Sequence, residues 1–74
     1  MRDINRIHPF CEKIADIWAT HSFFADQRFG QLMSNFFGWL MSEKGIDLFF
    51  PEENKMLEYF KEYAEKHGGW KMNE

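Results

Sequence analysis

Three polar residues share one side of a predicted helix and are the clearest candidates for chemistry. Arg28, Gln31 and Asn35 are spaced i, i+3 and i+7, so a helix would place their side chains on one face. A planar guanidinium and two amides can make directional hydrogen bonds to a protein partner or to the edges of adenine and guanine. The same groups can instead be satisfied within their own chain, with Arg28 paired to an acid such as Asp47. Both interpretations stay open at the level of sequence.

Gly38 and Trp39, on the same predicted helix, also suggest a contact surface. Gly38 costs about 1 kcal/mol relative to alanine in a helix interior, and a close approach by another chain or a local bend would offset that cost. Trp39 falls beside Arg28 and Asn35 rather than with the phenylalanines, and tryptophan and arginine are enriched at interface hot spots. The alternative is that Trp70 or the N-terminal residues cover Trp39.

Metal and catalytic motifs are weak in this chain. His8 and Cys11 lie three residues apart, but a structural zinc site needs four nitrogen or sulfur ligands and no CxxC or HxxxH motif completes one. His21 and His67 are better explained as residues near helix C-termini, where a cation is favoured. No Ser/His/Asp or Cys/His catalytic arrangement and no glycine-rich phosphate loop is present. We therefore expect no metal, no cofactor and no enzymatic activity.

Composition and charge narrow the class of protein further. The chain has 74 residues, 45% of them hydrophobic and 19% aromatic, which predicts a folded domain with a small core. Its net charge is −3, which argues against binding of duplex DNA through a basic face. The single cysteine excludes an internal disulfide, and neither a signal peptide nor a long apolar run is visible. We expect a cytoplasmic protein with no membrane contact.

The hydrophobic pattern predicts an all-α protein, a compact three-helix bundle with short connections. The helices are expected at about residues 9–21, 27–43 and 51–67. Pro9 and Pro51 suit first-turn positions, where a missing N–H is not needed. The chain should form one domain over residues 1–74, with residues 70–74 frayed.

Capping residues mark the ends of the middle helix. Asp26 is the favoured N-cap, with Ser22 as an alternative, because a side-chain oxygen can accept an unpaired backbone N–H. Gly45 can take the left-handed position after the last turn, and Ile46 can then fold back on Met41. The apolar stripes of the three helices form the predicted core. They comprise Ile4, Ile7, Phe10, Cys11, Ile14, Ile17, Trp18 and His21; Phe29, Leu32, Met33, Phe36, Phe37, Leu40 and Met41; and Met56, Leu57, Tyr59, Phe60, Tyr63, Ala64 and His67.

Three segments of the chain resemble a family of short, mostly uncharacterised bacterial and phage proteins. The segments are RIHPFCEKIADIW (6–18), DQRFGQLMSN (26–35) and DLFFPEEN (47–54), and the family pattern runs "RI-P-I-IW", "PD-RFGQL-N" and "D-FY-ED". The resemblance implies a compact helical fold and an origin in a mobile element, without implying a reaction. This chain departs from the pattern at Ala25, where the family has proline, and at Phe50, where it has tyrosine.

A small protein-interaction module is the function that these observations favour. Aromatic residues lie outside or at the edge of the three stripes, and a chain of this size has little room to bury them all. The partner would be another protein, a host protein or a second copy of this chain, and nucleic-acid binding by residues 27–43 and a purely structural dimer are the alternatives. The residues expected to bind the partner are Arg28, Gln31, Asn35, Gly38, Trp39, Phe23 and Phe24.

Overall fold

The computed structural model describes residues 1–72 and shows an all-α fold. A 3₁₀ turn, η1 (Ile4–Arg6), leads into α1 (Ile7–Thr20), which is followed by α2 (Ser22–Ala25), α3 (Phe29–Glu43) and α4 (Glu53–His67). The all-α class and the three long helices are therefore as predicted. The described residues contain a fourth helix, the short α2, where the sequence suggested only a link.

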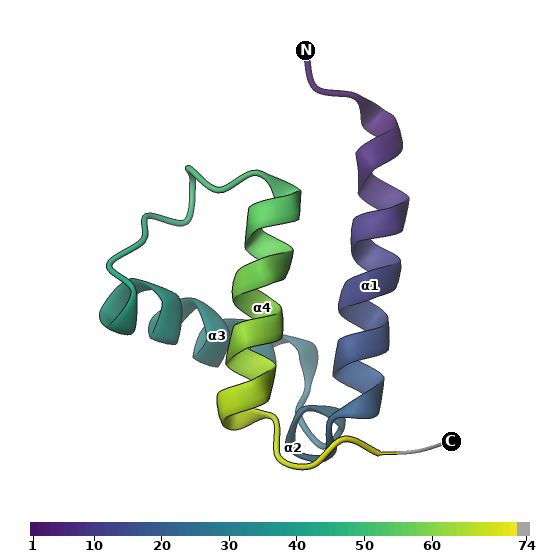
Figure 1. The fold of residues 1–74 in the computed structure, drawn as a ribbon, viewed down its shortest axis with the longest axis vertical. Helices are drawn as coiled ribbons and strands as arrows, with labels where there is room; N and C mark the ends of the chain where they lie inside the picture. Colours follow the sequence, from purple (N-terminus) through teal and green to yellow (C-terminus); the bar gives the residue numbers. More distant parts are fainter. Residues whose placement is uncertain (73–74) are drawn as a thin grey trace.

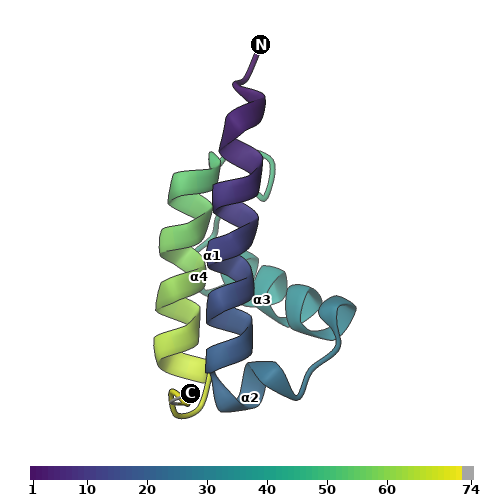
Figure 2. The ribbon, with the colours of Figure 1, turned by 90° about the vertical axis from the view of Figure 1, so that its right-hand side faces the viewer.

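The long helices form a parallel pair and a crossing helix. α1 and α4 lie side by side and run in the same direction, and α3 crosses them at a steep angle (Figures 1 and 2). A link through residues 44–52 carries the chain from the far end of α3 back to the start of α4. None of the helices in residues 1–72 is both long and apolar enough to cross a bilayer.

The first helix begins two residues earlier than predicted because Asp3 caps the turn before it. The Asp3 carboxylate accepts the N–H of Asn5 at 2.9 Å, which satisfies one of the unpaired donors at a helix start. Pro9 then lies in the first turn of α1, as expected for a residue without an N–H.

The predicted caps of the middle helix are half right. Arg28, not Asp26, occupies the N-cap position of α3, and it makes no side-chain capping bond. Asp26 instead ends α2. Gly45 has the predicted positive φ of 64°, and the Ile46 N–H donates to the Leu40 carbonyl at 3.3 Å. The backbone hydrogen bond that Ile46 makes to the end of α3 is thus accepted by Leu40, one residue before Met41.

The C-terminal segment is paired through residue 72. The Trp70 carbonyl accepts the N–H of Ser22 at 3.0 Å, and the Met72 N–H donates to the Thr20 carbonyl at 2.6 Å. The Trp70 N–H donates to the Ser22 hydroxyl at 3.1 Å. Residues 70–72, which were predicted to fray, are thus held by these hydrogen bonds in the structure. Residues 73–74 lie outside the described part of the chain.

The core sits between α2, α3 and α4. Its buried members are Phe24, Leu32, Phe36, Leu40, Leu57, Phe60, Tyr63 and Ala64. No residue of α1, all of which the structure describes, is fully buried. Phe29 and Met41, predicted as core, keep 61% and 51% of their surface exposed. The cause is the crossing of α3, since only one edge of its broad apolar arc meets α4.

Candidate functional site

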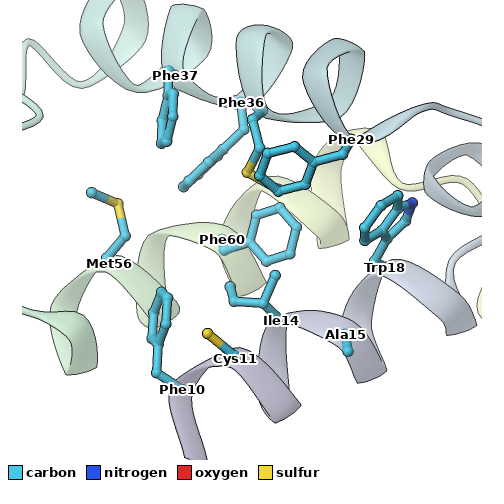
Figure 3. A pocket seen from close by; sticks show the side chains of 11 residues that line it. Phe10, Cys11, Ile14, Ala15, Trp18, Phe29, Phe36, Phe37, Met56 and Phe60 are labelled. Carbon is cyan, nitrogen blue, oxygen red and sulfur yellow. The ribbon is translucent and has the colours of Figure 1, made fainter. Parts of the chain in front are cut away.

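An apolar cleft opens between α1 and α3, with α4 as its floor. It encloses about 340 Å³, within the range of about 300–1,000 Å³ usual for ligand pockets. Figure 3 shows side chains from all three helices pointing into it. We call it the α1–α3 cleft; it is lined by Phe10, Cys11, Ile14, Ala15 and Trp18 of α1, by Phe29, Met33, Phe36 and Phe37 of α3, and by Met56 and Phe60 of α4.

Aromatic contacts fix the shape of the α1–α3 cleft. At one end Trp18 and Phe29 meet, with ring centroids 5.9 Å apart. At the floor Phe36 packs edge-on against Phe60 at 4.9 Å, which holds α3 on α4. On the floor Phe60 is completely buried and Met56 is half-buried, whereas both walls carry exposed side chains.

The chemistry of the cleft is that of hydrocarbon and sulfur. Among the described residues, those that line it carry no charged side chain. Ala15, on the α1 wall, is exposed. On the α3 wall, Gly30 follows Phe29, and a Cβ built on Gly30 has no described atom within 4 Å outside its own helix backbone and chain neighbours. The cleft can therefore bury apolar side chains and lets a backbone approach its edges. Among the described lining residues the Cys11 thiol is the one group capable of acid–base chemistry or zinc binding, and no second such group lines the cleft beside it.

The sequence pattern predicted every lining residue except Ala15 to be core, so it did not reveal the cleft. Cys11, Ile14 and Trp18 fall on the apolar stripe of α1, as predicted, yet none is fully buried. A signal was present in the sequence: the stripe continues upstream through Ile4 and Ile7, further than a crossing helix can cover. The hydrophobic periodicity identifies the apolar face of α1. Only the angle at which α3 crosses α1 shows that part of this face is left uncovered.

The predicted polar strip is exposed and lies outside the cleft lining. Arg28 and Gln31 are exposed, and no ion pair between Arg28 and Asp47 occurs among residues 1–72. Asn35 donates to the Gln27 side-chain oxygen at 3.2 Å, which ties α3 to the link before it. Asn35 thus has the loop-tying role considered from sequence, whereas Arg28 and Gln31 stay available to a partner.

Trp39 is half-buried and has partners within its own chain. Its ring lies 5.2 Å from Tyr63, and the ammonium groups of Lys44 and Lys66 each lie 5.9 Å from its centroid. Both lysines also pair with Glu62, at 2.7 and 3.1 Å. The hydrogen bond that Lys44 donates to the Glu62 carboxyl, together with a weaker contribution from Lys66, holds the pKa of that carboxyl below its usual range. Neither Trp70 nor the N-terminus, the covers considered from sequence, is needed to explain Trp39.

The two phenylalanines predicted to bind a partner have opposite environments. Phe24 is completely buried and stacks on Phe60 and Tyr63, with centroids 5.5 and 5.4 Å apart. It is a core residue, so its assignment to a partner-binding surface is wrong. Phe23 remains 55% exposed and packs edge-on against Trp70. Gly38 is exposed, with no described atom within 4 Å of a built Cβ.

The histidines and the cysteine are not gathered into a site. Within residues 1–72, no three His, Cys, Asp or Glu side chains come together in a way that would hold a metal ion. Cys11 is a free, exposed thiol. It belongs to the α1–α3 cleft and is the most reactive group there.

Comparison with known proteins adds no relative: no protein-family model, no curated protein and no solved structure matches this chain. The site must therefore be interpreted from its own geometry.

Proposed function

We propose that this chain is a small, non-enzymatic protein-interaction module that binds an amphipathic helix of another protein in the α1–α3 cleft. The observation that carries the proposal is an apolar cleft of about 340 Å³ with exposed walls in a chain of 74 residues. Helix-in-groove binding uses such a surface, because apolar residues at i, i+3, i+4 and i+7 of the bound helix enter the groove together.

The lining of the cleft favours a protein segment over a polar metabolite. A small-molecule site normally adds a few convergent polar groups that orient the ligand, and the described lining supplies none with a charge. Three sulfur-containing residues, Cys11, Met33 and Met56, line the cleft. Methionine side chains adapt to differently shaped apolar partners, which suits a protein surface.

The resemblance to phage proteins supports a more specific form of the proposal. In this more specific proposal the partner is a host protein, and this chain inhibits the host protein by occupying one of its helices. The proposal also places the chain in the cytoplasm, which its single cysteine supports. Nucleic-acid binding by α3 has weaker support, because Arg28 is the one basic residue of the polar strip and the net charge is −3.

Selection from a library of amphipathic helical peptides tests the proposal. Peptides enriched by the wild-type chain should share apolar anchors at helical spacing and should bind Ala15→Arg at least tenfold more weakly. Ala15 is exposed and lines the cleft, so the arginine blocks the site without entering the core. Ala19→Arg is the matched control: the same exposed residue type, on the same helix, outside the cleft lining.

Two results would contradict the proposal. One is a selection in which no helical peptide is enriched. The other is a set of peptides that bind Ala15→Arg and Ala19→Arg equally well, since their site would then lie elsewhere.

A further inference from the structure

The apolar stripe of α1 continues past the cleft, where no other helix covers it. Ile4 and Ile7 precede Cys11 on the same face of the helix, at 73% and 42% exposure. The views in Figures 1 and 2 both show this end of α1 projecting beyond the start of α4. One chain therefore carries an apolar cleft and, directly beside it, an exposed amphipathic helix end of the kind that the cleft would bind.

We propose that the helix bound in the α1–α3 cleft is α1 of a second copy of this chain, the two helices crossing antiparallel about a two-fold axis near Cys11. The inference rests on the proposed function, for which it names the partner. In this arrangement Ile4 and Ile7 of each copy enter the cleft of the other, beside Ile14 and Trp18. The contact is isologous, so it closes as a dimer and leaves no open end.

Polar side chains along the edge of the stripe are complementary in this orientation, because a glutamate carboxylate can accept a hydrogen bond from an imidazole N–H. His8 and Glu12 are exposed and lie one turn apart at the outer edge of the stripe. In an antiparallel pair centred near these residues, His8 of one copy lies opposite Glu12 of the other, and the two-fold axis makes the contact twice. A parallel pair would turn this edge toward the opposite edge of the partner's stripe, so the His8–Glu12 contact is specific to the antiparallel orientation.

The available area points to a weak dimer. A standard interface buries about 800 Å² on each partner, whereas the whole chain has 5597 Å² of accessible surface. Half the wall of a helix running from residue 4 to residue 18, roughly 22 Å long and 10 Å wide, is about 350 Å². The α3 wall of the cleft adds to this, which gives an interface at the small end of the specific range. We expect a dissociation constant in the micromolar range.

Sedimentation across the micromolar range, combined with substitutions, tests the proposal. The wild-type chain should form a dimer, and Ile7→Asp should weaken it at least tenfold. Phe49→Asp is the matched control, because Phe49 is an exposed apolar residue, at 92%, on the link before α4 and outside the cleft. His8→Glu should also weaken the dimer, and adding Glu12→Lys to it should restore the affinity.

Cys11 provides an independent measurement of the geometry. A short bis-maleimide should join two copies through this single cysteine at dimer-forming concentrations, and Ile7→Asp should suppress the cross-link. A wild-type chain that stays monomeric overturns the inference. So does a dimer that Ile7→Asp leaves intact, or one that the reagent does not join.

The inference and the proposed function can fail separately. A monomeric chain that still selects helical peptides, with the Ala15→Arg dependence, overturns the second copy as partner but keeps the cleft as a helix-binding site. A monomeric chain that selects none overturns both. A dimer that a selected peptide dissociates supports both.

Discussion

The two sides of α1 differ in how completely they are covered. On the side toward α4 the helices run parallel along their length, and Arg2 and Arg6 pair with Glu52 and Glu53 at 2.8 and 2.6 Å. On the side toward α3, the aromatic contact is made at one end, where Trp18 meets Phe29. A parallel neighbour closes a helix face along its length, whereas a crossing neighbour closes it at one point. The cleft is the geometric consequence of that crossing.

The largest loss of stability should come from a substitution in the buried core between α2, α3 and α4. Phe24→Ala removes a completely buried ring that stacks on Phe60 and Tyr63, and a loss of about 3–5 kcal/mol in the free energy of unfolding is expected. Urea denaturation measures it. The neighbouring Phe23→Ala is the control, because Phe23 is 55% exposed. Equal losses for the two variants would show that α2 does not anchor the core as described.

A smaller difference in stability is expected between alanine substitutions at the two glycines that have positive φ. Gly69 has φ of 79°, and an alanine Cβ there would lie 2.9 Å from a Phe23 ring atom, in addition to a clash with the Ser22 hydroxyl. Gly45 has φ of 64° and no described atom within 4 Å. Gly69→Ala should therefore cost more than Gly45→Ala, for which about 1 kcal/mol is expected. Thermal unfolding of both variants checks the order, and the reverse order would contradict the pairing of residues 20–22 with 70–72.

The open region should tolerate substitution. Phe29 is 61% exposed, so Phe29→Ala should cost less than about 1 kcal/mol in stability. The same change removes part of the cleft wall, and helical peptides should bind the variant several-fold more weakly. Calorimetric titration measures the binding. A variant that unfolds like Phe24→Ala would mean that Phe29 is core and the cleft is closed.

The smallest effect concerns pH. The pKa of Glu62 is lowered in the folded chain by Lys44 and Lys66, so its charged form stabilises the fold at pH values above the ordinary pKa of the carboxyl. That contribution is lost as the pH falls through the lowered pKa. Glu62→Gln should thus be slightly less stable than wild type near neutral pH and equal to it in acid. A difference that persists in acid would assign the effect to packing.

Sequence reasoning predicted the elements well because the signals are local. The apolar periodicity placed all three long helices, and Gly45 marked the end of α3 correctly. The cap at Asp3, which starts η1 and α1 earlier than expected, was not predicted because Pro9 is itself a typical first-turn residue. The short helix α2 was not predicted because four residues are too few to show a helical period. The C-terminal pairing with Ser22 depends on contacts between residues far apart in the chain, which periodicity does not encode.

The candidate site was harder to predict than the fold. Phe29 and Leu32 lie on the same apolar arc of α3, yet one is exposed and the other buried. What separates them is the angle at which α3 crosses α4, a tertiary property. Trp39 shows the converse, since a residue that looked exposed on a helical projection is half-buried against Tyr63.

Methyl-resolved NMR of the chain, titrated with a selected helical peptide, tests the central claim most directly. If the α1–α3 cleft is the binding surface, the methyl signals of Ile14, Met33 and Met56 should shift together and saturate at one equivalent. The Ile46 methyl groups, on the link between α3 and α4, should stay unchanged. Shifts confined to Ile46, with the three cleft signals unchanged, would contradict the account.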